Sequence, residues 1–130
     1  LNSKNKNYYD VIMFYHVIEH LEKPIEYLEK IYGSLKKNGI LIIGTPNCNS
    51  LASKFFKGNY RLLGETHLSL FNPLSLENIL KRKGFKLIKK EYPFFKTKYF
   101  NFINLLKMLL FWKLSPPFYG NLMTFYVQKI

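Results

Sequence analysis

The stretch that decides the fold is YYDVIMFYHVIEHLEKPIEYLEKIYGSLKKNGILIIG, residues 8–44. Its first eight residues are mostly apolar, β-branched or aromatic, and they predict a buried strand. Pro24 then stands where helices favour proline, and apolar residues recur at helical spacing until the Asn38-Gly39 pair, a typical helix stop. The apolar run 40–44 predicts a second buried strand. Strand, helix and strand in this order predict a parallel unit with a right-handed crossover.

Shorter elements are predicted in the rest of the chain. They are a polar turn (45–50), a short helix with a loop (51–71), a helix from Asn72-Pro73 to Gly84, a strand (85–92) and a strand (121–130). The last strand alternates in polarity, which favours a position at the edge of the sheet. The order of elements predicts an α/β fold, and 130 residues are enough for one domain or part of one.

An apolar and basic segment, residues 96–120, separates the last two predicted strands. Asn101, Asn104 and Lys107 form a thin polar stripe in it at helical spacing. Its apolar part is shorter than the about 20 residues that a membrane-spanning helix needs. Two alternatives stay open. The segment is a helix packed on this domain or on chain outside this sequence, or it is a helix seated on a membrane surface, which Trp112 beside Lys113 would suit.

The charge of the chain is strongly positive, at +12, and unevenly distributed. Residues 66–130 hold eleven Lys and Arg against two acidic residues. This asymmetry favours an anionic substrate or an anionic membrane surface. Nucleic acid is not expected, because no RNA-binding signature or DNA-reading helix is present. A single cysteine, Cys48, fits a reducing compartment, so we expect a cytoplasmic protein, with contact at the inner face of the membrane as an option.

The motif His16-x-x-Glu19-His20 matches the inverted zincin pattern of zinc hydrolases. Such a site needs both histidines one turn apart on a long helix, and a third ligand elsewhere. Here His16 ends a predicted strand and Pro24 opens the next helix, which leaves at most a turn or two between them. After residue 66 the acids are only Glu77 and Glu91. A zinc hydrolase is therefore the third-ranked alternative.

The predicted sheet offers a second interpretation of the same residues. Ligands of parallel α/β sheets bind outside the carboxyl ends of the strands, where His16 and Asn47 would meet. Glu19, His20 and His67 could converge there, and Glu19 and His20 would suit general acid or base catalysis. The structural alternative is that Glu19 and His20 cap and brace the following helix, and that His67 is a packing histidine.

Three segments in order carry a family resemblance: DVIMFYHVIEHLEKP, LKKNGILIIGTPN and THLSLFNPLSLENILKRKGF. They closely resemble class I S-adenosylmethionine-dependent methyltransferases. The resemblance is nearest to the branch of ubiquinone-biosynthesis O-methyltransferases and the methyltransferases of sugar and polysaccharide clusters. It covers residues 8–92 and, more weakly, 121–130, and it leaves out the insertion 96–120.

The resemblance implies a seven-stranded Rossmann-like sheet of which this chain holds strands four to seven, the last antiparallel. It implies that Phe14, Tyr15 and His16 lie against the methionine part of S-adenosylmethionine. Asn47 and His67 would border the pocket of a small-molecule substrate, such as a saccharide, a quinone or a lipid-linked compound. The methyl group would pass to an oxygen or nitrogen of that substrate, with His20 or His67 taking its proton.

The sequence departs from the family in two ways. None of its seven glycines forms a G-x-G pair, so the glycine-rich loop that binds the cofactor is not in these 130 residues. The chain therefore resembles a C-terminal half, and we expect it to bind the cofactor weakly alone. An acid stands at the position of His16 in quinone-biosynthesis relatives, where it helps to hold a divalent metal, so no metal is expected here. An inactive interaction module is the alternative function, and an exposed sheet edge would allow a homodimer.

Overall fold

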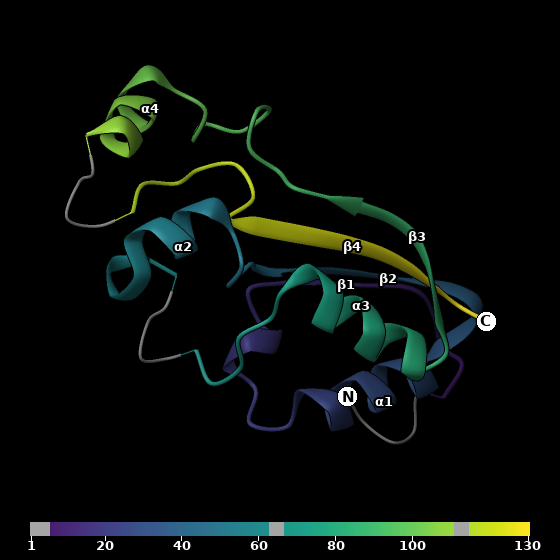
Figure 1. Cartoon of the computed structure of the whole chain (residues 1–130). Coiled ribbons are helices and arrows are strands. Elements are labelled where there is room, and N and C mark those ends of the chain that lie inside the picture. Colours follow the sequence, from purple (N-terminus) through teal and green to yellow (C-terminus); the bar gives the residue numbers. More distant parts are fainter. Residues whose placement is uncertain (1–5, 63–66, 111–114) are drawn as a thin grey trace.

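The computed structural model describes residues 6–62, 67–110 and 115–130 (Figure 1). Its elements are β1 (Tyr9–Tyr15), η1 (Ile18–His20), α1 (Pro24–Ser34), β2 (Leu35–Pro46), α2 (Leu51–Phe56), η2 (Lys57–Asn59), α3 (Pro73–Arg82), β3 (Phe85–Glu91), α4 (Phe102–Leu109) and β4 (Leu122–Lys129). The predicted strand, helix, strand order of residues 8–44 is confirmed, and so are the helix before Gly84 and both later strands.

The four described strands form one sheet in the order β1-β2-β4-β3. β1 and β2 are parallel, as the crossover helix requires, with Phe14 opposite Ile43. β4 runs antiparallel to both of its neighbours. The prediction of an edge strand at 121–130 is wrong, because β4 lies between β2 and β3. Its alternating pattern arises from one face in the core and one half-covered face.

Helices α1 and α3 cover one face of this sheet (Figure 1). The core between them and the strands is apolar and fully buried, with Leu28, Ile31, Leu76 and Leu80 from the helices and Leu41, Ile43, Phe125 and Val127 from the strands. Asn72 and Ser75 form a reciprocal capping box that begins α3, and Gly84, at φ +86°, turns the chain after it. On the other face, Val11, Met13 and Tyr15 of β1 are exposed.

Helix α1 ends earlier than its sequence pattern predicts. The sequence pattern predicts that the helix ends at the Asn38-Gly39 pair, but the last helical residue is Ser34. Leu35 is fully buried and pairs with Tyr9 in extended backbone, so tertiary packing starts the strand there. Asn38, at φ +65°, turns the chain inside the β2 segment instead. The Asn38-Gly39 pair therefore does form a turn, but this turn lies within β2 and not at the end of the helix.

Helix α4 forms within the segment 96–120 and buries none of its own side chains among the described residues. The Asn101 side chain caps its first turn by accepting from the Asn104 backbone N–H, at 2.9 Å. The helix contacts the domain through Met108, which packs against the cluster of Ala52, Phe56 and Tyr60. Whether its exposed side packs on chain outside this sequence or on a membrane surface stays open. In the described part of the chain, no helix has both the length and the apolar character to cross a bilayer.

Gly44 gives a direct test of the β1–β2 packing. A Cβ at this position would lie 2.0 Å from the ring of Tyr15 on the neighbouring strand. We expect Gly44→Ala to lower the free energy of unfolding by about 1–3 kcal/mol, because the ring must move. Adding Tyr15→Ala should recover most of the loss in urea unfolding. Gly33→Ala, which meets no atom within 4 Å, is the control, and an equal loss there would contradict the packing argument.

Candidate functional site

The carboxyl ends of β1 and β2 lie side by side, as parallel pairing requires. Tyr15 stands opposite Gly44, and the backbone N–H of His16 donates to the Gly44 carbonyl at 2.9 Å. His16 then adopts a left-handed backbone, at φ +54°, which is uncommon for a residue other than glycine. This turn ends the strand and directs the chain into η1, which carries Glu19 and His20.

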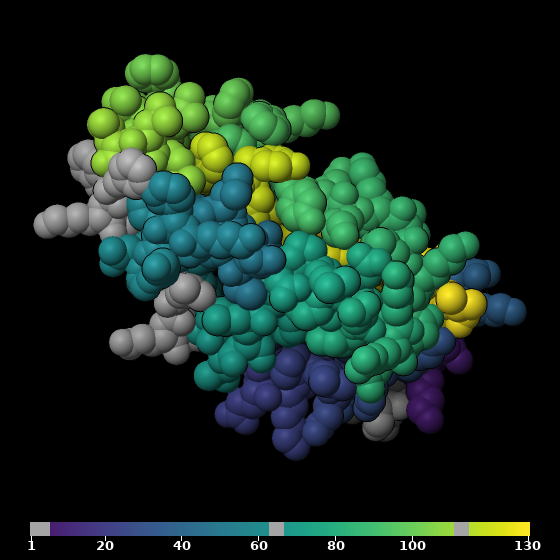
Figure 2. Space-filling view, in the orientation of Figure 1, coloured from purple at the N-terminus to yellow at the C-terminus, as the bar shows by residue number. Residues whose placement is uncertain are grey.

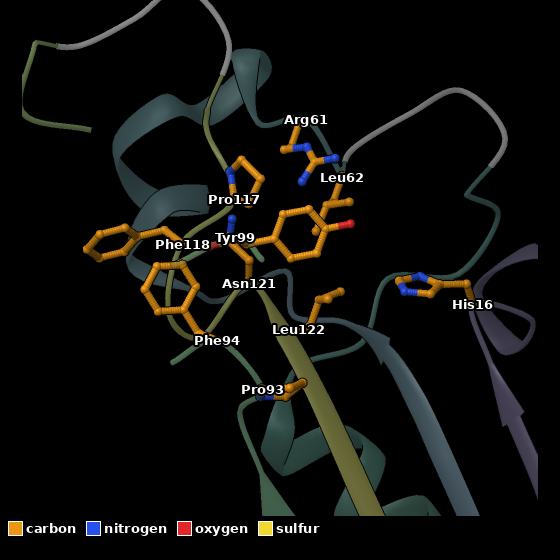
Figure 3. A pocket seen from close by; sticks show the side chains of 10 residues that line it. All are labelled: His16, Arg61, Leu62, Pro93, Phe94, Tyr99, Pro117, Phe118, Asn121 and Leu122. Carbon is orange, nitrogen blue, oxygen red and sulfur yellow. The ribbon is translucent and has the colours of Figure 1, made fainter. Parts of the chain in front are cut away.

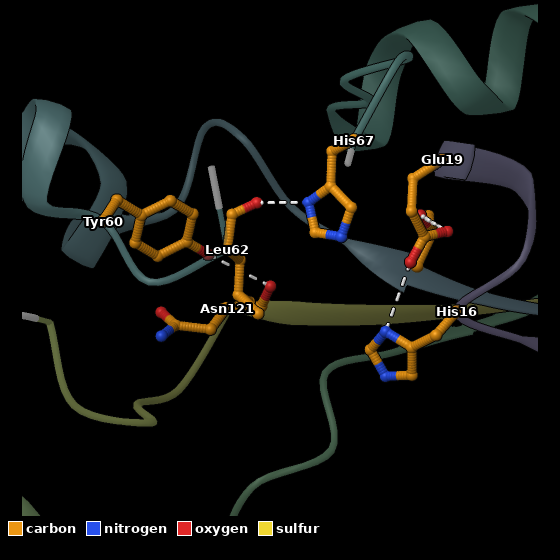
Figure 4. Close-up of polar contacts among 7 residues, drawn as sticks. His16, Glu19, Tyr60, Leu62, His67 and Asn121 are labelled. Carbon is orange, nitrogen blue, oxygen red and sulfur yellow. Dashed lines mark hydrogen bonds and ion pairs between the residues drawn. The ribbon is translucent and has the colours of Figure 1, made fainter. Parts of the chain in front are cut away.

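Glu19 is buried, with 1% of its surface exposed, and both carboxylate oxygens accept hydrogen bonds. Oε1 accepts from Nδ1 of His16 at 3.2 Å (Figure 4), and Oε2 accepts from the Thr45 hydroxyl at 2.9 Å. Burial raises the pKa of this carboxyl, but the hydrogen bonds from His16, its own backbone and Thr45 outweigh it, so the pKa is lowered. Glu19 therefore stays ionised at neutral pH and holds His16 in place.

His20 and His67 pack against each other beside Glu19. Their ring centroids are 4.7 Å apart, and the Ser69 backbone N–H donates to the Glu19 carbonyl at 3.0 Å. Nδ1 of His67 lies 2.7 Å from the Leu62 carbonyl, which can only accept, so this nitrogen carries the proton (Figure 4). In neutral His67, Nε2 is then left with a lone pair that can accept a proton.

Glu19, His20 and His67 each offer one ligand atom, and these three atoms lie within 4.8 Å of one another. They are the residues that could hold a metal ion here, although both oxygens of Glu19 already accept hydrogen bonds. The expected absence of a metal stays a prediction. The structure agrees with the argument against a zinc hydrolase, because His16 directly follows a strand, η1 has three residues, and His16 is outside this described cluster.

A cavity of about 140 Å³ opens beside His16 at the same end of the sheet (Figure 3). Its walls come from distant parts of the chain and include Arg61, Tyr99, Phe118 and Asn121. Asn121 donates from Nδ2 to the Pro116 carbonyl at 3.2 Å. Its Oδ1 is buried and has no hydrogen-bond partner in the described part of the chain. The cavity thus combines aromatic walls and one guanidinium.

The residues expected at the cofactor do not share one surface. Phe14 faces the α1 side, with its ring 6.4 Å from that of Tyr27, whereas Tyr15 covers Gly44 on the other side. Asn47 is buried, donates from its side chain to the Gly120 carbonyl and accepts from the Asn49 N–H. Asn47 is not among the residues that line the cavity of His16. The ligand roles of all four residues stay predictions.

α1 begins at Pro24, and its N-cap residue Lys23 makes no side-chain capping hydrogen bond in the described chain. The Glu19 carboxylate accepts from His16 and Thr45 instead of capping this helix, and a bracing role for Glu19 and His20 stays a prediction. Sequence reasoning also missed three residues of this region, Thr45, Arg61 and Asn121. Thr45 ends the second strand beside Gly44, so its position was a usable signal. Arg61 and Asn121 stand in loops with no pattern that marks them.

Comparisons with known proteins agree with this geometry. A family model described as a methyltransferase domain matches residues 2–90. The chain belongs to this family. No curated protein sequence matches the chain. The resemblance to class I S-adenosylmethionine-dependent methyltransferases is therefore confirmed for the domain family, whereas the ubiquinone or sugar branch stays a proposal.

Several solved structures share the fold of this methyltransferase domain. An S-adenosylmethionine-dependent methyltransferase from Archaeoglobus fulgidus is 23% identical with a TM-score of 0.63, over 96% of this chain and 61% of that chain. A possible histamine N-methyltransferase from Thermotoga maritima is 16% identical with a TM-score of 0.64, over 97% and 58%. A methyltransferase-like protein from Bacillus halodurans is 13% identical with a TM-score of 0.66, over 99% and 73%. The chain spans less than two thirds of the length of the first two.

The buried Glu19 carboxylate predicts a pH-dependent stability. Because its pKa is lowered on folding, its contribution is present above the unfolded value of about 4.3 and is lost as the pH falls through the lower folded value. We expect Glu19→Gln to lower the free energy of unfolding at pH 7 by about 1–3 kcal/mol. The difference from the unaltered chain should shrink in acid.

Urea unfolding at a series of pH values measures this difference. Glu26→Gln is the matched control, since Glu26 is exposed and paired with Lys23 at 3.0 Å. An exposed pair contributes little, so the control should change stability by less than about 1 kcal/mol. A Glu19→Gln difference that does not vary with pH would contradict the role given to its charge.

Proposed function

We propose that this chain is the C-terminal part of an S-adenosylmethionine-dependent methyltransferase that methylates an oxygen or nitrogen of a small molecule. The observation that carries this proposal is the joint position of His16, Glu19 and the cavity at the carboxyl ends of two parallel strands. This end of an α/β sheet is where ligands bind. The family match over residues 2–90 supports the reaction class.

The cofactor would supply an electrophilic methyl group on its sulfonium. Tyr15 and His16 could form one wall for its methionine part, since both stand at the end of β1 with exposed side chains. No G-x-G occurs in the 130 residues, so they lack the backbone loop that would approach the rest of the molecule. These residues alone do not fit the whole cofactor.

The chain's own residues would act mainly by orienting the acceptor toward the methyl group. Neither His67 nor His20 is among the residues that line the cavity, but His67 lies against Leu62, which does. His67 is the better-defined base, because the Leu62 carbonyl fixes its Nδ1 proton and leaves Nε2 to accept a proton. His20, in ring contact with it, is the second candidate. Glu19 would hold His16 at the mouth of the cavity through its 3.2 Å contact.

The cavity favours an acceptor with an apolar or aromatic body. Tyr99 and Phe118 would pack against that body, and Arg61 would pair with an acidic group on it. Quinone precursors, acidic saccharides and lipid-linked compounds all carry such groups, so the class of acceptor is proposed only at this level.

An inactive interaction module is the second candidate function. The exposed apolar side chains of α4 favour it, as does the sequence without a glycine-rich loop. A homodimer through the outer edge of β1 is part of this proposal, because exposed strand edges favour association. In that case, substitutions at His16, Glu19 and His20 would have no effect on the cellular role.

Cofactor affinity tests whether these 130 residues hold only part of the cofactor site. We expect isothermal titration calorimetry to show weak or no binding of S-adenosylmethionine by residues 1–130, because the chain has no G-x-G loop. Low-micromolar binding would contradict this. The native polypeptide should be weighed, and its N-terminal peptides mapped, before the same titration is made on it. A native mass near 15.5 kDa would favour the interaction module instead.

His67→Asn tests the proposed base in the native polypeptide. Asparagine can keep the hydrogen bond to the Leu62 carbonyl but cannot accept a proton as Nε2 does. We expect transfer of labelled methyl to a small-molecule extract of the source cells to fall by about 10²–10⁴-fold. Cofactor affinity should be unchanged. An unaltered rate would dismiss His67 and leave His20→Asn as the next test, and no transfer by the unaltered protein would contradict the enzyme proposal.

A further inference from the structure

Helix α4 and the residues before it form a protruding surface that we call the α4 surface (Figure 2). Its exposed apolar side chains are Phe95, Phe100, Phe102, Ile103, Leu105, Leu106, Leu109 and Leu110. Phe102 is 75% exposed and Leu109 is 65% exposed. Single exposed apolar residues are common, but a contiguous group of this size marks an interaction surface.

The α4 helix is oriented with its polar side inward. Asn104 and Lys107 are half-buried, and Nδ2 of Asn104 donates to the Tyr99 carbonyl at 2.9 Å. Met108 is the apolar residue that packs inward, against the cluster of Ala52, Phe56 and Tyr60. In the described part of the chain, the helix thus turns Asn104, Lys107 and Met108 inward and leaves its most apolar side chains outside, which is the reverse of an ordinary surface helix.

The charge around this surface selects the kind of partner. Residues 92–130 contain no Asp or Glu. Lys96 and Lys98 stand directly before α4, and both are exposed. A second copy of the chain would bring like charges together on this surface, whereas an anionic surface would be attracted. Apolar side chains flanked by lysines are what a helix needs to insert shallowly among anionic lipid headgroups.

We propose that the α4 surface binds the anionic face of a lipid bilayer, with its apolar side chains inserted among the lipids. The cavity wall lies directly behind it, since the ring of Phe94 is 5.5 Å from that of Phe100 and 5.4 Å from that of Phe95. Phe94 and Tyr99 also line the cavity. If the proposed methyl transfer holds, an acceptor anchored in the bilayer would reach the cavity along these aromatic side chains.

Co-sedimentation with phospholipid vesicles tests the proposal without any need for activity. We expect the chain to bind phosphatidylcholine vesicles that contain phosphatidylserine, to bind pure phosphatidylcholine much more weakly, and to bind less as salt is raised. The double variant Ile103→Gln with Leu109→Gln should weaken binding by at least about tenfold. Leu68→Gln with Leu74→Gln is the matched control, since both leucines are 60% exposed or more and lie outside α4.

Charge-reversal variants distinguish lipid binding by the lysines of this surface from attraction by the overall positive charge of the protein. Lys98→Glu should weaken vesicle binding severalfold more than Lys30→Glu, which changes an exposed lysine on α1. Equal losses for the two lysine variants, or for the two leucine-containing pairs, would overturn the proposal, as would the absence of binding. Sedimentation velocity completes the test. If the unaltered chain is a dimer and the Ile103→Gln, Leu109→Gln variant is a monomer, the α4 surface binds a second copy of the chain and the lipid proposal is overturned.

Discussion

One buried carboxylate, that of Glu19, holds together the end of the sheet where the candidate site lies. It accepts hydrogen bonds from residues at the ends of two parallel strands, His16 after β1 and Thr45 at the end of β2. A buried charge without such partners would be strongly destabilising, so the turn at His16 and the position of η1 depend on these contacts. The contact between His20 and His67 also depends on Glu19, because the Ser69 backbone N–H donates to the Glu19 carbonyl and holds the segment of His67 there.

Much of the fold could be predicted because its signals are local. The crossover unit follows from Pro24 and the two apolar runs, and α3 follows from Asn72 at its start and Gly84 after its end. The errors concern tertiary pairing. Leu35 leaves the helix because the core and Tyr9 require it in a strand, and β4 enters the sheet interior because β2 and β3 both pair with it. Neither requirement is visible in a window of neighbouring residues.

The part of the candidate site at the strand ends could be predicted from the sequence, whereas the part contributed by loops could not. Strand ends of a parallel pair must meet, so the convergence of His16 and Glu19 followed from the fold class. Arg61, Tyr99 and Asn121 reach the cavity from loops that lie 38 and 22 residues apart along the chain, and nothing local indicates their contact. For α4, the helical period was visible, but a period alone does not tell which side of the helix faces the protein.

The central position of β4 has a consequence for the order in which the protein can be built. This strand follows the other described elements in the sequence, yet it separates β2 from β3, and its residues Met123, Phe125 and Val127 complete the core. During synthesis from the N-terminus, β1 and β2 can pair early with α1 packed on them. β3 must wait, with its pairing groups open, until residues 122–129 leave the ribosome. The half-built sheet is then the species most in need of protection from unwanted strand pairing.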